Sequence, residues 1–391
     1  MSHLQRLPEL WLWRASFFQG EGVMSYQPPF RADIVGSFLR PAALKQARTA
    51  FQQGAIDAAA LRAVEDREIR QVVAQQEALG LRVVTDGEFR RAWWHFDFLE
   101  HLNGVTGYQG EQGIQFQGVQ TSAKQVRIDG KVGFNPAHPM IEHFRYLNSV
   151  ATVTPKMTIP SPSVLHFRNA GKIDSGVYPS LEGFFSDLAD AYRDVVQAFY
   201  QAGCRYLQLD DTVWAYLCSN RELEAAQARG LDTDNLQAIY AEVINHALAD
   251  KPDDLHVSLH VCRGNFRSTW ISEGGYEPVA ETLFGKVGVD AWFLEYDSDR
   301  AGSFDPLRFI PEGHQQAVLG LITTKVGTLE KPEAVRARLE EACRFVAKDQ
   351  LCLSPQCGFA STEEGNNLAE QAQWEKLRLT LDIAERFWGR G

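Results

Sequence analysis

The chain contains 391 residues, of which 45% are hydrophobic and 23% are charged, and its formal net charge is −11. This composition is typical of a globular protein with one large domain or two medium ones, and its acidic balance makes nucleic acid and anionic membranes unexpected partners. No apolar run approaches the roughly 18 residues that a membrane-spanning helix requires.

The first two dozen residues differ from the rest of the chain. The segment MSHLQRLPELWLWRASFFQGEGV contains large apolar residues but no clean hydrophobic region followed by small ones, which argues against a signal peptide. Met24 offers a second start, and strand-like sequence follows it. We therefore expect residues 1–23 to be an extension outside the fold and residues 24–391 to form one catalytic domain.

Short β-rich segments alternate with longer helical patterns along the rest of the chain, including helical patterns over residues 186–202 and 235–249. Such alternation is typical of α/β folds, and eight strands is the number in a closed (β/α)8 TIM barrel. We therefore predict a single barrel of this kind. The expected strands are residues 32–37, 83–88, 152–159, 206–211, 256–262, 291–296, 317–323 and 351–357.

Residues 104–139 interrupt the alternation between the second and third predicted strands. This segment is rich in Gly, Gln and alternating apolar residues, which is typical of a hairpin. Because it follows the carboxyl end of a strand, we expect a hairpin-like insertion near the mouth of the barrel, where active sites form.

An aromatic cluster and acidic side chains follow the second strand. That strand ends in DGE at residues 86–88, and the fourth ends in DD at residues 210–211. Such carboxylates bind ammonium groups, act as general bases or orient metal ligands, or they pair with Arg90, Arg91 or Arg263 in a structural role. The aromatic residues line a cavity or pack in the core, and we do not expect His95 to bind metal. They are Trp93, Trp94, His95 and Phe98.

Four metal-capable residues lie at or just beyond the ends of later strands. His260 and Cys262 occur in SLHVCRGN, Glu295 occurs in WFLEYDSD, and Cys357 occurs in LSPQCGFAS. Even positions of residues 256–262 are polar or metal-capable and odd positions are aliphatic, the period of a strand with two different faces. An imidazole, two thiols and a carboxylate suit zinc, although a hydrogen-bonded polar core would use the same residue types.

Six cysteines without a CxxC pair argue against a disulfide framework and an ordinary zinc ribbon, and they fit a reducing cytoplasm best. Cys343 shares an apolar stripe with Val335, Leu339 and Val346 on a helix expected to begin near Pro332, so we expect it in the core. No GxGxxG or GxxxxGK[ST] motif supports a nucleotide cofactor.

The motifs VGSF, DGEF, LQLDD, HVC, a glutamate in the next strand and PQCG occur in this order and resemble the catalytic barrel of cobalamin-independent methionine synthase. The resemblance covers roughly residues 31–391, and DGEFRRAWWHFDFLE and TIPSPS are similar to small single-barrel relatives. It implies a zinc ion held by His260, Cys262, Glu295 and Cys357.

The same resemblance implies roles for residues around the substrate. Glu88 and Asp210 would bind the amino group of homocysteine, and Gly36 and Ser37 match the backbone that meets the amino acid. Glu295 is the expected mobile zinc ligand, because its hard oxygen competes poorly with a soft thiolate. Together with Asp210 it is the expected catalytic pair.

Two departures leave the methyl donor open. Folate-using enzymes of full length contain a second barrel, for which this chain has no room, and residues 156–163 lack the tryptophan associated with the pterin site. The donor is therefore a folate, methylcobalamin, a smaller methyl compound or a methyl group delivered by a partner protein.

The expected function is zinc-dependent S-methylation of a small-molecule thiol, with homocysteine converted to methionine through a zinc-bound thiolate. The first alternative is an alkyltransferase that opens an epoxide with coenzyme M, although Glu88 and Asp210 would repel its sulfonate. The second is a non-catalytic zinc-binding or ligand-binding barrel. A decarboxylase of the uroporphyrinogen type needs no metal and would leave the four metal-capable residues unexplained.

Overall fold

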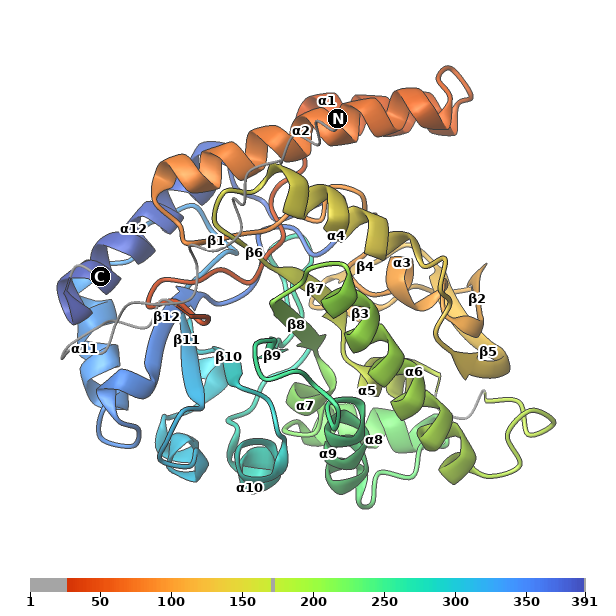
Figure 1. Ribbon diagram of the computed structural model, residues 1–391. Helices are drawn as coiled ribbons and strands as arrows, with labels where there is room; N and C mark the ends of the chain where they lie inside the picture. The colour runs from red at the N-terminus through yellow and green to blue at the C-terminus, as the bar shows by residue number, and fades with distance from the viewer. Residues whose placement is uncertain (1–26, 170–172, 390–391) are drawn as a thin grey trace, which may run out of the picture.

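The computed structural model describes residues 27–169 and 173–389, so the predicted extension at residues 1–23 lies outside the described residues. Among the helices of the described ranges, none combines the length and apolar character needed to cross a membrane. The fold is α/β, with strands at the centre and helices around them (Figure 1).

A parallel sheet of six strands forms the centre, in the order β12-β11-β10-β9-β8-β7. Its strands are almost entirely buried, which explains their continuous apolar sequences, because helices cover a parallel sheet. Five of the eight predicted strands are confirmed here to within two residues at each end, and the sixth sheet strand forms the last part of the predicted strand 152–159. The six are β7 (Met157–Pro160), β8 (Tyr206–Asp211), β9 (His256–Val261), β10 (Ala291–Glu295), β11 (Gln316–Ile322) and β12 (Leu351–Pro355).

The first strands are shorter than predicted. β1 (Val83–Val84) pairs in parallel with β6 (Thr154–Pro155), which Lys156 separates from β7. The prediction of a regular strand over residues 32–37 is wrong, because this segment forms only an isolated parallel bridge from Ala32 to Leu353. The backbone of this segment leaves the extended conformation at Gly36, which has a φ of +144°. Gly36 also lies so close to β7 that a Cβ added to it would be 2.9 Å from the methyl group of Thr158.

Helices follow most of the strands and cover the outside of the sheet (Figure 1). The helical pattern at 186–202 belongs to α6, whose buried Phe184, Leu188, Tyr192 and Val195 recur every three or four residues. The longer helices are α1 (Ala42–Gln52), α2 (Ala58–Leu79), α4 (Pro139–Val150), α6 (Leu181–Gln201), α8 (Asn220–Ala228), α9 (Leu236–Ala247), α10 (Glu277–Lys286), α11 (Pro332–Ala342) and α12 (Glu370–Trp388).

Shorter helices occupy several connections, and one cysteine differs from its prediction. Helix α11 begins at Pro332 as expected, but Cys343 is its C-cap and is only half-buried, because the helix ends one residue earlier. The short helices are α3 (Phe96–Leu99), α5 (Pro162–Arg168), α7 (Val213–Tyr216), η1 (Asp299–Ala301), η2 (Asp305–Phe309) and η3 (Lys348–Gln350).

The chain between β1 and β6 contains two small antiparallel sheets. β2 (Asn103–Gln109) pairs with β5 (Lys124–Gly133), and β3 (Gln115–Phe116) pairs with β4 (Val119–Gln120). The β2–β5 pair stands at one edge of the molecule, beside α6 (Figure 1). These strands occupy the segment for which we expected a hairpin.

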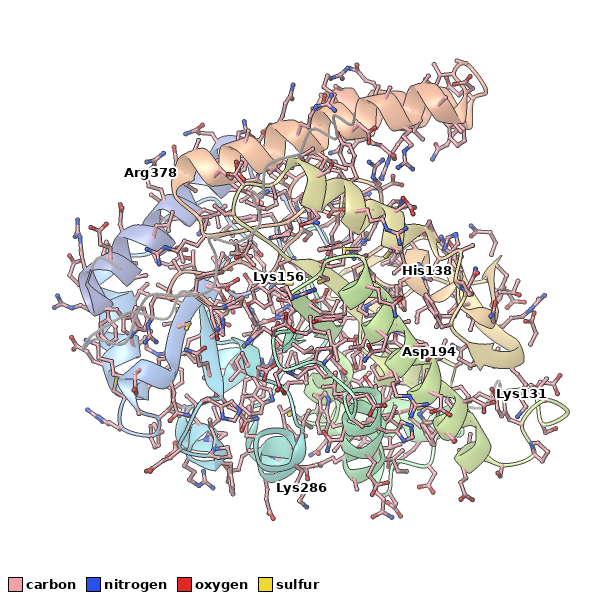
Figure 2. The ribbon with its side chains drawn as sticks, in the orientation of Figure 1. Lys131, His138, Lys156, Asp194, Lys286 and Arg378 are labelled. Carbon is pink, nitrogen blue, oxygen red and sulfur yellow. The ribbon has the colours of Figure 1, made fainter. Side chains whose placement is uncertain are left out.

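An ion pair is buried in the interior of the molecule, beside β7 and β8. The Lys156 ammonium lies 3.0 Å from the Asp33 carboxylate and donates to Gln208 at 3.0 Å, with both charged side chains fully buried. Figure 2 shows Lys156 in the middle of the molecule, whereas Lys131 stands at its edge. Because an unpaired buried charge is costly, this pair ties the N-terminal segment to β7 and β8.

Candidate metal centre and reaction pocket

Three of the four predicted metal ligands lie together. His260 is the penultimate residue of β9, Cys262 follows that strand, and Cys357 follows β12. Their candidate donor atoms all lie within 4.8 Å of one another, and the two sulfur atoms are 3.4 Å apart. Both thiols are free and all three residues are buried. The end of the parallel sheet therefore assembles one nitrogen and two sulfur donors.

The His260 ring is oriented as a metal ligand requires. Its Nδ1 is 3.3 Å from the carbonyl oxygen of Phe293, and its Nε2 is buried without a hydrogen-bond partner among the described residues. In metal sites the second ring nitrogen of a ligating histidine usually bonds to a carbonyl or carboxylate, which fixes the tautomer. The unpartnered Nε2 is thus available to an ion.

The two thiols also favour a cation. The hydrogen bond with Cys357 and burial together raise the pKa of Cys262 well above its ordinary range. A divalent ion supplies the positive charge that two adjacent thiolates need, and zinc prefers this combination of nitrogen and sulfur. The backbone N–H of Gly264 also donates to the Cys262 sulfur at 3.3 Å. These residues fit zinc.

Glu295, the fourth predicted ligand, lies outside the group formed by the other three. Its buried carboxylate accepts the backbone N–H of Arg263 at 3.0 Å and the Arg300 guanidinium at 3.1 Å, and the Lys325 ammonium is 3.9 Å away. Burial alone would raise its pKa, but Lys325, Arg263 and Arg300 hold the pKa of Glu295 below its ordinary value. The carboxylate is therefore ionised and engaged with cations.

Glu88 and Asp210 line the same pocket as the three metal-capable residues. Thr158 donates to one Glu88 oxygen at 3.0 Å and Arg91 lies 3.6 Å from it, so the pairing with Arg91 does occur. The other Glu88 oxygen has no hydrogen-bond partner in the described part of the chain. Glu88 also has a φ of +60°, a strained conformation for a residue with a side chain.

Asp210 accepts a hydrogen bond from Gln208 at 2.7 Å. Burial and the nearby Glu88 carboxylate raise the pKa of Asp210 to about 7, against the opposing charge of His260. A raised pKa of this kind is common at functional sites, because two nearby buried carboxylates resist full ionisation. An ammonium group placed between Glu88 and Asp210 would relieve that repulsion.

Of the two remaining predicted residues, Ser37 lines the pocket and Gly36 does not. The Ser37 carbonyl accepts the backbone N–H of Phe359 at 2.8 Å, which holds this segment against the loop after β12. The Gly36 carbonyl instead accepts the hydroxyl of Thr85 at 2.5 Å. Ser37 is therefore placed to meet a substrate directly, and Gly36 shapes the backbone behind it.

The lining of the pocket also includes aromatic and apolar side chains. Trp93, Trp94 and His95 line it together with Ile114 and Phe116 from the insertion, whereas Phe98 is buried in the core. Both ring nitrogens of His95 are buried and lack partners among the residues described. Burial, aided by Arg168 and Lys124, holds the pKa of His95 well below its ordinary range, so the ring is neutral.

A larger cavity of about 620 Å³ adjoins this pocket. The two share Ile114, Phe116, Arg168, Tyr216 and Ile271, and three basic residues line the larger one. The basic residues are Arg168, Arg221 and Arg229.

The sequence did not identify Arg300 and Lys325 as site residues. Both follow the carboxyl ends of strands, Arg300 after β10 and Lys325 after β11. Glu295 is the first charged residue near the carboxyl end of a buried strand. Lys325 occupies the same kind of position in LGLITTK. Because lysine is not a zinc ligand, a pattern of metal donors does not reveal Lys325.

The chain is similar to known proteins over most of its length. A sequence model described as "Cobalamin-independent synthase, Catalytic domain" matches residues 30–385. The chain is 53% identical over 364 residues to YxjG, an uncharacterized protein of Bacillus subtilis strain 168. This alignment covers 93% of this chain and 96% of that protein. It is 23% identical over 337 residues to the methionine synthase of Sulfurisphaera tokodaii, covering 86% of this chain and 88% of that enzyme.

A similar fold is seen in a crystal structure from Listeria monocytogenes of the vitamin-B12-independent methionine synthase type. The two chains are 44% identical with a TM-score of 0.76, and the alignment covers 93% of this chain and 99% of the other. Both the sequence and the fold of this chain are therefore similar to those of these proteins over nearly the whole length of the described residues.

Proposed function

The chain belongs to the family of cobalamin-independent methionine synthase catalytic domains, and on this premise we propose that it is a zinc-dependent S-methyltransferase that converts homocysteine to methionine. The observation that carries the proposal is the buried group of His260, Cys262 and Cys357 in one pocket with two carboxylates. A polar core without a ligand would not leave the imidazole Nε2 unpartnered beside two thiols.

We further propose that the strands close into a (β/α)8 barrel within a single domain of residues 24–391. The pairings support a closed ring of strands. β1 pairs with β6, and Ala32 forms a bridge to Leu353 of β12. The Phe38 N–H donates to the Gly87 carbonyl, which joins the segment after Ala32 to the segment after β1. In such a barrel the active site forms at the carboxyl ends of the strands, which is where the metal-capable residues lie.

In the proposed mechanism His260, Cys262 and Cys357 hold the zinc, with Glu295 as a fourth ligand that can leave. When bound, zinc supplies the positive charge that keeps a substrate thiol as the nucleophilic thiolate near neutral pH. The Phe293 carbonyl keeps the His260 ring in place. Trp93 and Trp94 line the same pocket and would limit the access of water to it, so that the protein contributes mainly position.

The carboxylates favour an amino-acid thiol. The free oxygen of Glu88 and the Asp210 carboxylate would bind the homocysteine ammonium, and the Ser37 backbone would meet the amino acid beside them. The sulfonate of coenzyme M would be repelled by the same groups. This charge arrangement favours homocysteine over the epoxide-opening alternative.

The methyl donor follows less directly from the pocket. The absence of tryptophan in residues 156–163 favours a smaller methyl compound or a partner protein over a free polyglutamylated folate. Arg168, Arg221 and Arg229 around the adjoining cavity favour a donor that carries negative charge. Donors of both kinds therefore belong in the test.

The test is methionine formation from homocysteine by the zinc-loaded protein, followed by mass spectrometry. Methylfolates with one and three glutamates, methylcobalamin, S-methylmethionine and a cell extract would be compared as donors. We expect slow transfer from free triglutamyl folate and faster transfer from another donor or from the extract, and no transfer by the Cys262→Ser variant. Rapid turnover with triglutamyl folate would show a complete folate enzyme, and no methionine from any donor would contradict the proposed function.

A further inference from the structure

Glu295 is surrounded by cations from three separate segments. Arg263 follows β9, Arg300 lies on η1 after β10, and Lys325 follows β11. The Arg263 guanidinium is already engaged by the carbonyl oxygens of Gly274 and Glu295 and by the Tyr276 hydroxyl. Only its backbone N–H touches the carboxylate. The two remaining side chains, Arg300 and Lys325, are the ones whose pairing depends on where the carboxylate lies.

Lys325 is the less satisfied of the two. Its side chain is 6% exposed, and its ammonium has no hydrogen-bond partner within the described residues. The Glu295 carboxylate lies 3.9 Å away, close enough for an ion pair but too far for a hydrogen bond. A buried ammonium without a hydrogen bond is costly, so a small shift of Glu295 towards Lys325 would be favourable.

Arg300 is shared between two acids. It donates to Glu295 at 3.1 Å and to Asp297 at 3.0 Å. If Glu295 turned towards the metal position, Arg300 would keep its ion pair with Asp297, so this movement would not leave a buried guanidinium unpaired. Arg300 therefore tolerates Glu295 in either position, whereas Lys325 favours the position beside it.

We propose that Arg300 and Lys325 form a holding site for the Glu295 carboxylate, which moves there from the zinc when the substrate thiol binds. The proposal rests on the proposed zinc site. An incoming thiolate adds one negative charge, and the departure of Glu295 towards Lys325 keeps the charge around the metal unchanged while pairing the ammonium. Arg300 and Lys325 are thus positioning residues that open a coordination position for the thiol.

The first arm of the test measures homocysteine binding to the zinc-loaded protein by calorimetry. Lys325→Met keeps the length of the side chain but removes the charge, and it should weaken homocysteine binding roughly tenfold or more. Lys325→Arg should restore most of the affinity. Arg308→Met removes a cation from an exposed ion pair with Glu277 and should leave the affinity unchanged.

The second arm repeats Lys325→Met in a Glu295→Gln background, because loss of a cation could also weaken thiolate binding directly. If Lys325 acts by holding Glu295, the substitution should have little further effect once the carboxylate is gone. X-ray absorption at the zinc edge should show one oxygen donor replaced by sulfur when homocysteine binds to the unmodified protein. The same exchange should be incomplete in Lys325→Met.

Equal weakening by Lys325→Met in both backgrounds would overturn the proposal, as would an unchanged affinity in the single variant. Retention of the oxygen donor in the unmodified protein with homocysteine bound would also overturn it. These outcomes leave the zinc site itself intact. Failure of the unmodified protein to bind zinc would instead contradict the proposed function, and the inference with it.

Discussion

Cys262 and Cys357 present their sulfur atoms 3.4 Å apart in a buried site, with the His260 ring beside them. Without a cation the Cys262 thiol stays protonated, because its hydrogen bond with Cys357 and its burial raise its pKa well above the ordinary range. With zinc the two sulfur atoms are the strongest donors of the set. At the scale of single residues, the metal proposal therefore depends on these two side chains more than on Glu295.

We predict about one zinc per chain in the purified protein, since a single group of this kind occurs in the described residues. Cys262→Ser and Cys357→Ser should each lose most of the metal, measured by inductively coupled plasma mass spectrometry. Cys343→Ser is the matched control, because that thiol is half-buried at the end of α11 and should not affect zinc. Full zinc retention by both site variants would refute the metal centre.

The pH dependence of homocysteine binding tests Asp210. Burial and Glu88 raise its pKa to about 7, so it is mostly protonated at about pH 6 and mostly charged at about pH 8. A substrate ammonium favours the charged form, and homocysteine affinity should rise with pH through this window as binding releases a proton.

The control is 4-mercaptobutyrate, which carries the same thiol and carboxylate without an amino group. Its pH dependence reports thiol ionisation alone and should be weaker than that of homocysteine. In Asp210→Asn the two ligands should show the same slope. Equal slopes in the unmodified protein would mean that Asp210 does not meet the ammonium.

Sequence patterns were sufficient to predict that His260, Cys262 and Cys357 lie close together, because each lies at or just beyond the recognisable carboxyl end of a strand. The position of the Glu295 carboxylate could not be predicted in the same way. It is set by Arg300 and Lys325, which come from different connections and meet Glu295 only in the folded chain. Side-chain orientation at a site built from several segments is a tertiary property.

At the scale of secondary structure, prediction succeeded where burial was uniform. The boundaries of β8 match the expected residues 206–211, because every residue of that strand is buried and its two terminal acids mark its end. The prediction of a strand over residues 32–37 was wrong for a local reason. The positive φ at Gly36 and the close approach of Thr158 bend the segment away after a single bridge, and neither is visible in an alternation pattern.

The connection between β6 and β7 contains a testable ion pair. Lys156→Met would leave the buried Asp33 carboxylate without its cation, and we expect a loss of about 3–5 kcal/mol in the free energy of unfolding. Lys131→Met is the matched control, since Lys131 is 65% exposed in its pair with Asp187 and should cost less than about 1 kcal/mol. Urea denaturation measures both variants. Similar small losses for the two would show that the Lys156 pair does not stabilise the fold.

At the scale of the whole molecule, the parallel strands bring distant segments to one end of the sheet. His260 and Cys357 are nearly one hundred residues apart in sequence, yet their donor atoms lie within 4.8 Å. The insertion contributes Ile114 and Phe116 to the boundary between the reaction pocket and the adjoining cavity. Under the proposed function, this organisation would leave the reaction pocket for a small thiol and the adjoining cavity for part of the methyl donor.

The central claim is that zinc in this pocket binds the thiol of homocysteine. X-ray absorption at the zinc edge tests it most directly, with the zinc-loaded protein measured alone, with homocysteine and with coenzyme M. We predict that homocysteine adds one sulfur donor to the zinc, because Glu88 and Asp210 attract its ammonium, and that coenzyme M adds none at the same concentration. Sulfur added by coenzyme M but not by homocysteine, or an unchanged zinc environment with both, would contradict the account.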